Sequence, residues 1–438
     1  MAANGNPLIR TPNLDALARD GVSFAHSYVN AVACMPSRAC LMSGQHANAH
    51  GVLRTCRGPW LQPSTPTLPG CFSAAGYQTV GVGKMHFQPW HVLGGFDRRV
   101  FTESKYDGTG GQDEYRQTLK ALGLHNKNIG HHTPGFGKAF KTMPTTELPP
   151  DLHIDAFIGR RGAETLEQLA GRGGPFFLMV SFCGPHEPWD PPPPYDTMYD
   201  LGAMPTGWSR KGELDILPAR VLKGITDMGI EHLNLTAVPD AKKREITAYY
   251  YGNVTLIDHW VGRILDALKR RGLYDDTVIV FTSDHGEYLG DHNTYYKADF
   301  PCDSDCRVPL ILKAPGARPG ARPERIVGNV DIMPALLDLA GIRVPESCQG
   351  RNLLTAEPGS TPESECAITY SESGPSYRVR TRDWAYVRWA GGSPETLYHV
   401  AEDPHELNNL AGDTALAEQK RFMRDLLFRL PRRLTPDT

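Results

Sequence analysis

Cys34 and Arg38 are the two residues of this chain whose types and spacing point most directly to chemistry. Cys34 follows an extended segment, 22–29, and its loop, and it precedes a short helical stretch that contains Pro36. Proline suits a first helical turn because its missing N–H would have no partner there. The cysteine would then lie beside free backbone N–H groups at the positive end of a helix dipole, where a tetrahedral oxyanion binds favourably. Arg38 lies about one helical turn further on and can reach back toward the same anion.

Further polar residues each follow a short, continuous apolar segment of the chain. The segments are 78–82, 176–182 and 277–282, and the polar residues after them are Lys84, His86, His186, Asp284 and His285. Continuous apolar strands are buried on both faces, as in a parallel or mixed sheet covered by helices. Ligands of such sheets bind outside the carboxyl ends of the strands, so we expect these side chains to meet there.

Lys84 and His86 are two residues apart, so an extended backbone would point both side chains to the same side. A cationic pair on one wall of a pocket suits an anion with several oxygens. Taken alone, each of these signals also has a plainer interpretation. Lys84 would be a solvated lysine beside a chance histidine, His186 a loop histidine between prolines, and Cys34 a buried structural cysteine.

The apolar pattern predicts how these residues are held. Apolar residues at helical spacing predict a long helix over 242–271 and a second over 331–340, each ended by a glycine. Residues 1–345 therefore read as an α/β domain, with a large mixed, mostly parallel sheet sandwiched by helices. Residues 366–438 read as a smaller α+β subdomain with a short antiparallel sheet. Its expected elements are strands over 379–389 and 396–400 and a closing helix over 414–430.

The bulk composition excludes several classes of function. The chain has 438 residues, of which 40% are hydrophobic and 22% charged, and a formal net charge of −3, which is typical of a globular enzyme. We expect no nucleic-acid partner, because there is no long basic run, and no membrane span, because no apolar segment approaches the roughly 20 residues required. Nine cysteines without a repeated spacing do not indicate a disulfide framework. A zinc site at Cys302 and Cys306 with upstream histidines fits no standard spacing.

One stretch resembles the signature of the type I sulfatases, a family of the alkaline-phosphatase-like superfamily: it reads Cys-x-Pro-Ser-Arg-x-x-Leu-x-Ser-Gly from Cys34 to Gly44. Segments 83–86, 185–188 and 283–287, with Lys297, are similar to further motifs of that family. The resemblance covers nearly the whole chain. It implies hydrolysis of a sulfate ester to an alcohol and inorganic sulfate.

The resemblance also implies roles for individual residues. The residues implied in catalysis are Cys34, Arg38, Lys84, His86, His186 and Lys297. Cys34 would be oxidised to formylglycine by a formylglycine-generating or an anaerobic maturation enzyme, and a hydroxyl of the hydrated aldehyde would attack sulfur. The cations would spread the charge on the sulfuryl oxygens, and His186 would handle the proton of the leaving oxygen.

Asp284 and His285 would bind one divalent metal ion by the same resemblance. The carboxylate suits Ca²⁺ or Mg²⁺, with Ca²⁺ the first candidate, whereas an imidazole suits Mn²⁺ better. In the family, an apolar strand that ends in two metal-binding aspartates precedes the segment that begins here with Gly5, and we expect this strand to be absent from the chain as given. Neighbouring strands would then keep unpaired backbone groups, and the two remaining ligands would hold a metal poorly.

Two explanations of that absence stay open. The chain as given begins late within an ordinary sulfatase, or it is an inactive relative that binds sulfated ligands without cleaving them. The first residues contain neither a charged leader nor an apolar stretch, so they indicate no signal peptide. As given, the chain is expected in the cytoplasm, and a periplasmic or secreted location stays open for a form extended at its start.

The nature of the ester is a further open alternative. A phosphonate monoester or phosphodiester hydrolase would use the same nucleophile and the same cations, because a sulfuryl and a phosphoryl group differ mainly in charge. The expected partner is a sulfated small molecule or saccharide, besides the maturation enzyme. Residue types alone do not identify the alcohol, since specificity lies on loops.

Overall fold

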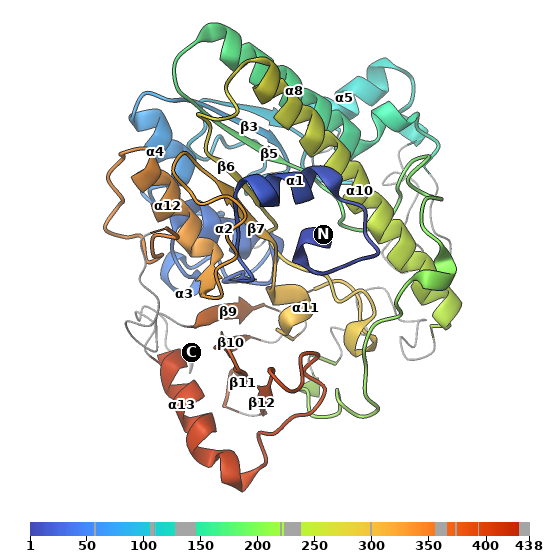
Figure 1. The fold of residues 1–438 in the computed structure, drawn as a ribbon, viewed down its shortest axis with the longest axis vertical. Helices are drawn as coiled ribbons and strands as arrows, with labels where there is room; N and C mark the ends of the chain where they lie inside the picture. The colour runs from blue at the N-terminus through green and yellow to red at the C-terminus, as the bar shows by residue number, and fades with distance from the viewer. Residues whose placement is uncertain are drawn as a thin grey trace.

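The computed structural model describes residues 1–56, 58–105, 109, 111–127, 146–219, 221–222, 238–297, 300–354, 366–372, 375–392 and 394–428. Helices cover both faces of the sheets in its larger part, and a smaller C-terminal part is built on an antiparallel sheet (Figure 1). The predicted α/β class with a C-terminal antiparallel sheet is confirmed. The proline-rich connector that the sequence suggests before residue 366 lies largely outside the described residues.

Three parallel strands form the first sheet of the larger part. β3 (Gln78–Gly83) lies between β4 (Arg98–Phe101) and β5 (Phe176–Ser181). α4 (Leu68–Ala74) packs on β3, and α8 (Ile154–Arg172) packs on both β3 and β5. Alternate residues of β5 join the hydrophobic clusters under these two helices, which is why the strand is apolar along its whole length.

A second group of strands makes the fold mixed. β7 (Leu310–Lys313) pairs antiparallel with both β1 (Val22–Ser23) and β6 (Ile279–Thr282). β2 (His26–Tyr28) pairs in parallel with β8 (Ile326–Gly328). Among the described residues, the predicted large sheet is thus divided into separate hydrogen-bonded sets.

Among the described strands, β5 and β6 each have a neighbouring strand along one edge only. The apolar residues of both strands are partly buried, whereas the polar residue that ends β5, Ser181, is buried. Other described strands, such as β1 and β4, are edge strands as well, so the expected absence of a strand stays a prediction. β5 and β6 are of interest because of the segments that follow them. They are the strands that lead to His186 and to Asp284.

Long helices cover this framework. α10 (Asp240–Arg270) follows Pro239 and corresponds to the helix predicted over 242–271. It packs on α8 at Gly159, where a Cβ would lie 2.4 Å from the side chain of Trp260. The other helices are α1 (Pro12–Asp20), α2 (Cys34–Ser43), α3 (Ala47–His50), α5 (Glu114–Ala121), α11 (Asp303–Cys306) and α12 (Ile332–Leu339). Among the helices described, none combines the length and the apolar character that a membrane span needs.

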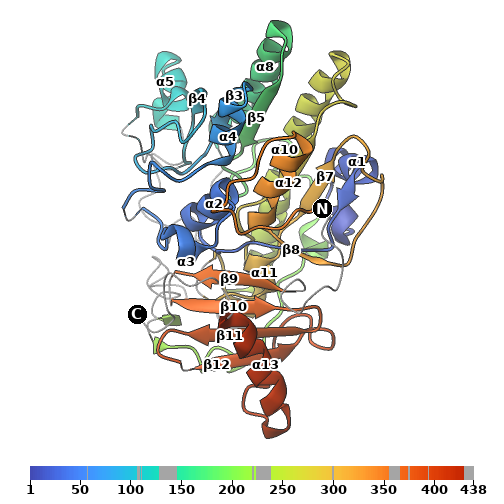
Figure 2. The same cartoon turned by 90° about the vertical axis from the view of Figure 1, so that its left-hand side faces the viewer.

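The C-terminal sheet consists of four antiparallel strands in chain order. They are β9 (Ala367–Ser371), β10 (Ser376–Arg380), β11 (Trp384–Trp389) and β12 (Glu395–His399). α13 (Ala417–Phe428) packs on β10 and β11 (Figure 2). The predicted end of this helix, at residue 430, lies outside the described residues.

The single strand predicted over 379–389 is wrong, because the chain reverses within it. Thr381 N–H donates to the Trp384 carbonyl at 2.9 Å, and Trp384 N–H donates to Thr381 Oγ1 at 3.2 Å, which closes a turn between β10 and β11. The turn contains neither glycine nor proline, and the alternation of apolar residues resumes directly after it. The one sign of the reversal was Asp383, a residue type that favours turns, and it is weak by itself.

Candidate active site

Cys34 is the first residue of α2, with Pro36 in the first turn, as the sequence predicts. Its side chain is buried. The preceding loop is held by the C-terminal sheet, since Val32 N–H donates to the Tyr370 carbonyl at 3.0 Å and Tyr370 N–H donates to the Asn30 carbonyl at 3.0 Å. The C-terminal part of the chain thus fixes the approach to the cysteine.

Basic side chains from several elements converge on the Cys34 sulfur. His285 Nε2 lies 3.1 Å from Sγ, and Lys84 Nζ lies 3.9 Å from it. Cys34 also acts on the pKa of His86 and on that of His186, so both side chains belong to the same group of interacting residues. All eight residues that the sequence analysis selected meet here, and we call them the Cys34 cluster: Cys34, Arg38, Lys84, His86, His186, Asp284, His285 and Lys297.

Arg38 uses its guanidinium to tie the ends of three strands together. Its Nε donates to Asp284 Oδ2 at 2.7 Å, after β6, and its Nη1 donates to the Lys84 carbonyl at 2.5 Å, after β3. The same Nη1 donates to Ser181 Oγ at 2.9 Å, at the end of β5. Arg38 therefore fixes the site as well as adding a positive charge beside Cys34.

Lys84 and His86 both reach Cys34, but not for the reason that the sequence suggested. The backbone is not extended here, because Gly83 has φ 87° and His86 has φ 59°. A Cβ at Gly83 would lie 2.2 Å from the Ser181 carbonyl oxygen, so this turn requires glycine. His86 Nε2 also lies 3.5 Å from the sulfur of Cys56, a residue that the sequence analysis did not single out.

Glu187 is a buried acid of the site that the sequence analysis missed. Its Oε2 lies 3.0 Å from His186 Nδ1 and 3.8 Å from Lys297 Nζ. The opposite ring nitrogen of His186, Nε2, lies 3.0 Å from Lys297 Nζ. The one signal in the sequence was an acid between a histidine and a proline directly after a buried strand.

Neighbouring charges outweigh burial at several groups of the cluster. Burial alone would raise the pKa of the Cys34 thiol, but Lys84 and other cations lower that pKa well below its usual range. Burial would also raise the pKa of Asp284, and Arg38 holds it far below its usual range instead. The pKa of His285 is raised because Asp284 outweighs the effect of burial. The cluster thus stabilises negative charge at the position of the sulfur.

Burial and neighbouring charges also compete in setting the pKa values of the groups around Glu187. Burial lowers the pKa of His186, whereas the pKa of Lys297 is raised because Glu187 and other anions outweigh burial. Burial, and then the nearby Glu187, raises the pKa of Glu287 to about 8. These shifts favour the neutral form of Glu287 and the charged form of Lys297.

Among the described residues, one group of three could hold a metal ion: Cys34, Asp284 and His285. Their ligand atoms lie within 4.8 Å of one another and comprise one sulfur, one carboxylate and one imidazole. Ca²⁺ takes six to eight oxygen ligands and Mg²⁺ a nearly octahedral set of oxygens, so these donors fit neither ion by themselves. Arg38 also binds one Asp284 oxygen. The metal predicted from the resemblance stays a prediction.

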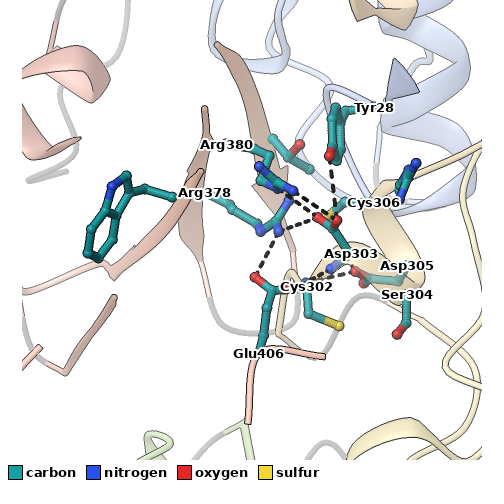
Figure 3. A network of polar contacts seen from close by, with 12 residues as sticks. Tyr28, Cys302, Asp303, Ser304, Asp305, Cys306, Arg378, Arg380 and Glu406 are labelled. Carbon is teal, nitrogen blue, oxygen red and sulfur yellow. Dashed lines mark hydrogen bonds and ion pairs between the residues drawn. The ribbon is translucent and has the colours of Figure 1, made fainter. Parts of the chain in front are cut away.

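A second cluster of charges joins the C-terminal sheet to α11, and we call it the Asp303 network (Figure 3). Arg378 Nη2 donates to Asp303 Oδ1 at 2.5 Å and to Glu406 Oε1 at 2.8 Å. Arg380 Nε donates to Asp303 Oδ1 at 3.2 Å, and the Tyr28 hydroxyl donates to Asp303 Oδ2 at 3.4 Å. Two arginines and two carboxylates therefore balance one another.

The Asp303 network is connected to the Cys34 cluster through the backbone of α11. Gly286 N–H donates to the Asp305 carbonyl at 2.8 Å, and Glu287 N–H donates to the Ser304 carbonyl at 3.1 Å. A Cβ at Gly286 would lie 2.1 Å from the Ser304 carbonyl oxygen. The turn that carries Asp284 and His285 therefore rests directly on α11.

Comparisons with known proteins identify the family of the chain. The sequence matches the Sulfatase family over residues 1–342, and the C-terminal region of N-sulphoglucosamine sulphohydrolase over residues 290–433. It is 30% identical to an arylsulfatase of Clostridium perfringens over 455 residues, which cover 98% of this chain and 91% of the relative. The chain therefore belongs to the sulfatase family, and the predicted enzyme class, a sulfuric ester hydrolase, is confirmed.

Solved structures share the fold. A phosphonate monoester hydrolase of Agrobacterium radiobacter superposes with a TM-score of 0.81 at 24% identity, over 98% of this chain and 92% of that one. A protein solved in complex with its substrate D-glucosamine-2-N,6-O-disulfate superposes with a TM-score of 0.72 at 23% identity, over 98% and 94%. At these identities the likeness establishes the common fold.

Proposed function

We propose that this enzyme hydrolyses a sulfate ester to an alcohol and inorganic sulfate, and that the nucleophile is a formylglycine formed at Cys34. The observation that carries the proposal is the convergence of three cations, Arg38, Lys84 and Lys297, on the position of one buried sulfur at a helix N-terminus. Such an excess of positive charge favours a tetrahedral anion at this point.

The first half of the reaction uses groups on both sides of position 34. A hydroxyl of the aldehyde hydrate would stand where the cysteine sulfur lies, pass its proton to a histidine of the Cys34 cluster and attack the substrate sulfur in line. The bond from sulfur to the alcohol oxygen breaks, and that oxygen takes a proton from the side of the site formed by His186 and Lys297. Lys84 spreads the charge that builds on the sulfuryl oxygens.

The second half regenerates the enzyme. A histidine of the Cys34 cluster accepts the proton of the remaining hydroxyl at position 34, the C–O bond to the bound sulfate breaks, and the aldehyde re-forms. Water then restores the hydrate. An unmodified cysteine lacks this second hydroxyl and cannot release the sulfate in this way, so we expect maturation to be essential for turnover.

The alcohol that we propose is part of a sulfated saccharide. The C-terminal match to N-sulphoglucosamine sulphohydrolase and the structural neighbour that binds a glucosamine disulfate support this substrate class. The structural likeness to a phosphonate monoester hydrolase supports an aryl phosphonate as the second candidate substrate.

The test combines mass spectrometry with turnover. The protein is produced with a formylglycine-generating enzyme, and the peptide that contains Cys34 is analysed for the loss of about 18 Da that converts the thiol to an aldehyde. Turnover is then compared for an aryl sulfate, an aryl phosphonate and glucosamine 6-sulfate. The proposal expects the aldehyde, with the aryl sulfate cleaved faster than the phosphonate.

Other outcomes would contradict the proposal in distinct ways. A faster reaction of the phosphonate would assign the second candidate function. An intact thiol together with binding of the sulfated sugar but no cleavage would indicate an inactive binding relative. Elemental analysis of the same sample for calcium, magnesium and manganese would identify any metal that the purified protein retains.

A further inference from the structure

Glu187 is a buried carboxylate at the edge of the Cys34 cluster to which the proposed mechanism gives no role. It is 2% exposed, and it lies in the loop that follows β5. Its Oε2 is 3.0 Å from His186 Nδ1 and 3.8 Å from Lys297 Nζ, so both groups on the leaving side of the site face one carboxylate. A buried charge is retained at a cost unless it is paired, and here its partners are these two residues.

One ring nitrogen of His186 faces hydrogen-bond acceptors, and the other faces a hydrogen-bond donor. Nδ1 donates to the Glu187 carbonyl oxygen at 2.9 Å, and it lies 3.0 Å from the Glu187 carboxylate, which attracts the same proton as an ion-pair partner. Nε2 lies 3.0 Å from Lys297 Nζ, which as an ammonium group only donates. His186 is therefore held as the tautomer with its proton on Nδ1 and a lone pair on Nε2.

We propose that Glu187 is a positioning residue, which fixes the tautomer of His186 and holds Lys297 so that one proton shared by Lys297 Nζ and His186 Nε2 faces the leaving oxygen. This inference rests on the proposed function. When the bond from sulfur to the alcohol breaks, the departing oxygen takes that proton, and Lys297 is left as a neutral amine. Lys297 recovers a proton from water after the products leave, and the Glu187 carboxylate stabilises the ammonium ion that forms.

Leaving-group dependence tests this role, because a weakly basic leaving group needs little protonation and a strongly basic one needs much. Glu187→Gln keeps the shape of the side chain but removes its charge. For nitrophenyl sulfate we expect kcat to fall by no more than about 3-fold. For unsubstituted phenyl sulfate we expect a fall of about 30- to 100-fold, which is at or below the lower end of a full general-acid contribution because the acid itself remains. KM should change little for either substrate, and Glu187→Asp should recover part of the loss.

Glu213 offers a matched control. It is another glutamate paired with a histidine, since its Oε2 lies 3.1 Å from His292 Nδ1, with both side chains largely buried. Glu213→Gln should leave the ratio of the two kcat values unchanged, whatever it does to stability. An equal fall of kcat for both sulfates in Glu187→Gln, or no fall, would overturn the proposal and assign Glu187 a purely structural role.

A second measurement does not depend on turnover, so it separates this inference from the proposed function. Nitrogen-15 NMR of histidine-labelled protein, with the His186 signals assigned from His186→Gln, should show the proton on Nδ1 in the unsubstituted protein. In Glu187→Ala the share of His186 with its proton on Nε2 should rise above that of the unsubstituted protein, although the main-chain carbonyl of residue 187 still accepts from Nδ1. An unchanged tautomer in that variant would overturn the proposal, even in a protein without sulfatase activity.

Discussion

The Cys34 cluster and the Asp303 network are both buried groups of charges, yet their charge balance differs. In the network, Arg378 and Arg380 pair with the carboxylates of Asp303 and Glu406. In the cluster, three basic side chains and several histidines face few acids, and the pKa of Cys34 is lowered well below its usual range. We expect the balanced group to act on the stability of the fold and the unbalanced one to bind a further anion.

The two groups are in contact, so the difference does not come from separate locations in the fold. The backbone of α11 carries Asp303 at one end and receives the N–H groups of Gly286 and Glu287. The network therefore supports the turn that presents Asp284 and His285. Substitutions should nevertheless separate the two groups: those in the Cys34 cluster should lower activity, and those in the Asp303 network should lower stability.

The largest effect is expected for Cys34→Ala in the matured enzyme. Removal of the nucleophile should lower kcat/KM by about 10⁴-fold or more, while the melting temperature changes little. Cys306→Ser, in the α11 segment beside the network, should lower the melting temperature and leave kcat/KM nearly unchanged. This buried thiol lies in an apolar cluster and takes no part in the chemistry. Aryl sulfate turnover and thermal unfolding of both variants measure the contrast, and substantial turnover by Cys34→Ala would contradict it.

Arg378→Met should cause the largest loss of stability. It leaves Asp303 with less positive charge and takes from Glu406 the one guanidinium that contacts it among the described residues. Breaking a buried ion pair costs about 3–5 kcal/mol of unfolding free energy. Urea unfolding measures this loss, and kcat of the folded fraction should stay within about 3-fold of the unsubstituted value. A large fall in kcat at unchanged stability would show that the network acts on the chemistry.

Arg38→Lys, at the Cys34 cluster, should lower activity much more than stability. A lysine keeps the charge but loses the planar fork that contacts Asp284, the Lys84 carbonyl and Ser181. We expect kcat/KM to fall by about 10²- to 10³-fold through lost transition-state stabilisation. The matched variant Arg380→Lys in the network should keep kcat/KM within about 3-fold. Similar kinetic losses in both variants would remove the distinction between the two groups.

Gly286→Ala should affect both groups together, because this glycine joins them. The new Cβ would meet the Ser304 carbonyl oxygen at 2.1 Å, so α11 and the turn at Asp284 must move apart. Overpacking of this kind costs about 1–3 kcal/mol. The melting temperature and kcat should fall in the same variant, whereas Gly272→Ala, at a position with open space around it, should leave kcat unchanged.

The smallest expected effect concerns the response to acid. Burial would raise the pKa of Asp303, but Arg378 and Arg380 hold it well below its usual range. A carboxyl group with a lowered folded pKa stabilises the fold above its unfolded pKa of about 3.9, and this contribution is lost as the pH falls toward the folded pKa. In Asp303→Asn, the unfolding free energy should therefore fall less between about pH 5 and pH 3 than in the unsubstituted protein. An identical acid dependence would contradict the pairing.

The sequence by itself determined the α/β class and the residues of the Cys34 cluster. Apolar strands and helical spacing are local patterns, and the residues after β3 and β5 meet because these two strands are parallel neighbours that end at one edge of a sheet. β6 lies in a separate, antiparallel set, so the tertiary structure brings Asp284 and His285 to the same place. The helix start at Cys34 was likewise readable from Pro36 and its neighbours.

Contacts between distant residues were decided by the tertiary structure. The left-handed backbone at His86, the fork of Arg38 across three strand ends and the turn within 379–389 depend on neighbours that no local pattern specifies. Glu187 gained its partner Lys297 from a segment 110 positions further along the chain. The physical reason is that charge balance and hydrogen-bond geometry are set by three-dimensional packing, whereas strand and helix periodicity are set by the order of residues.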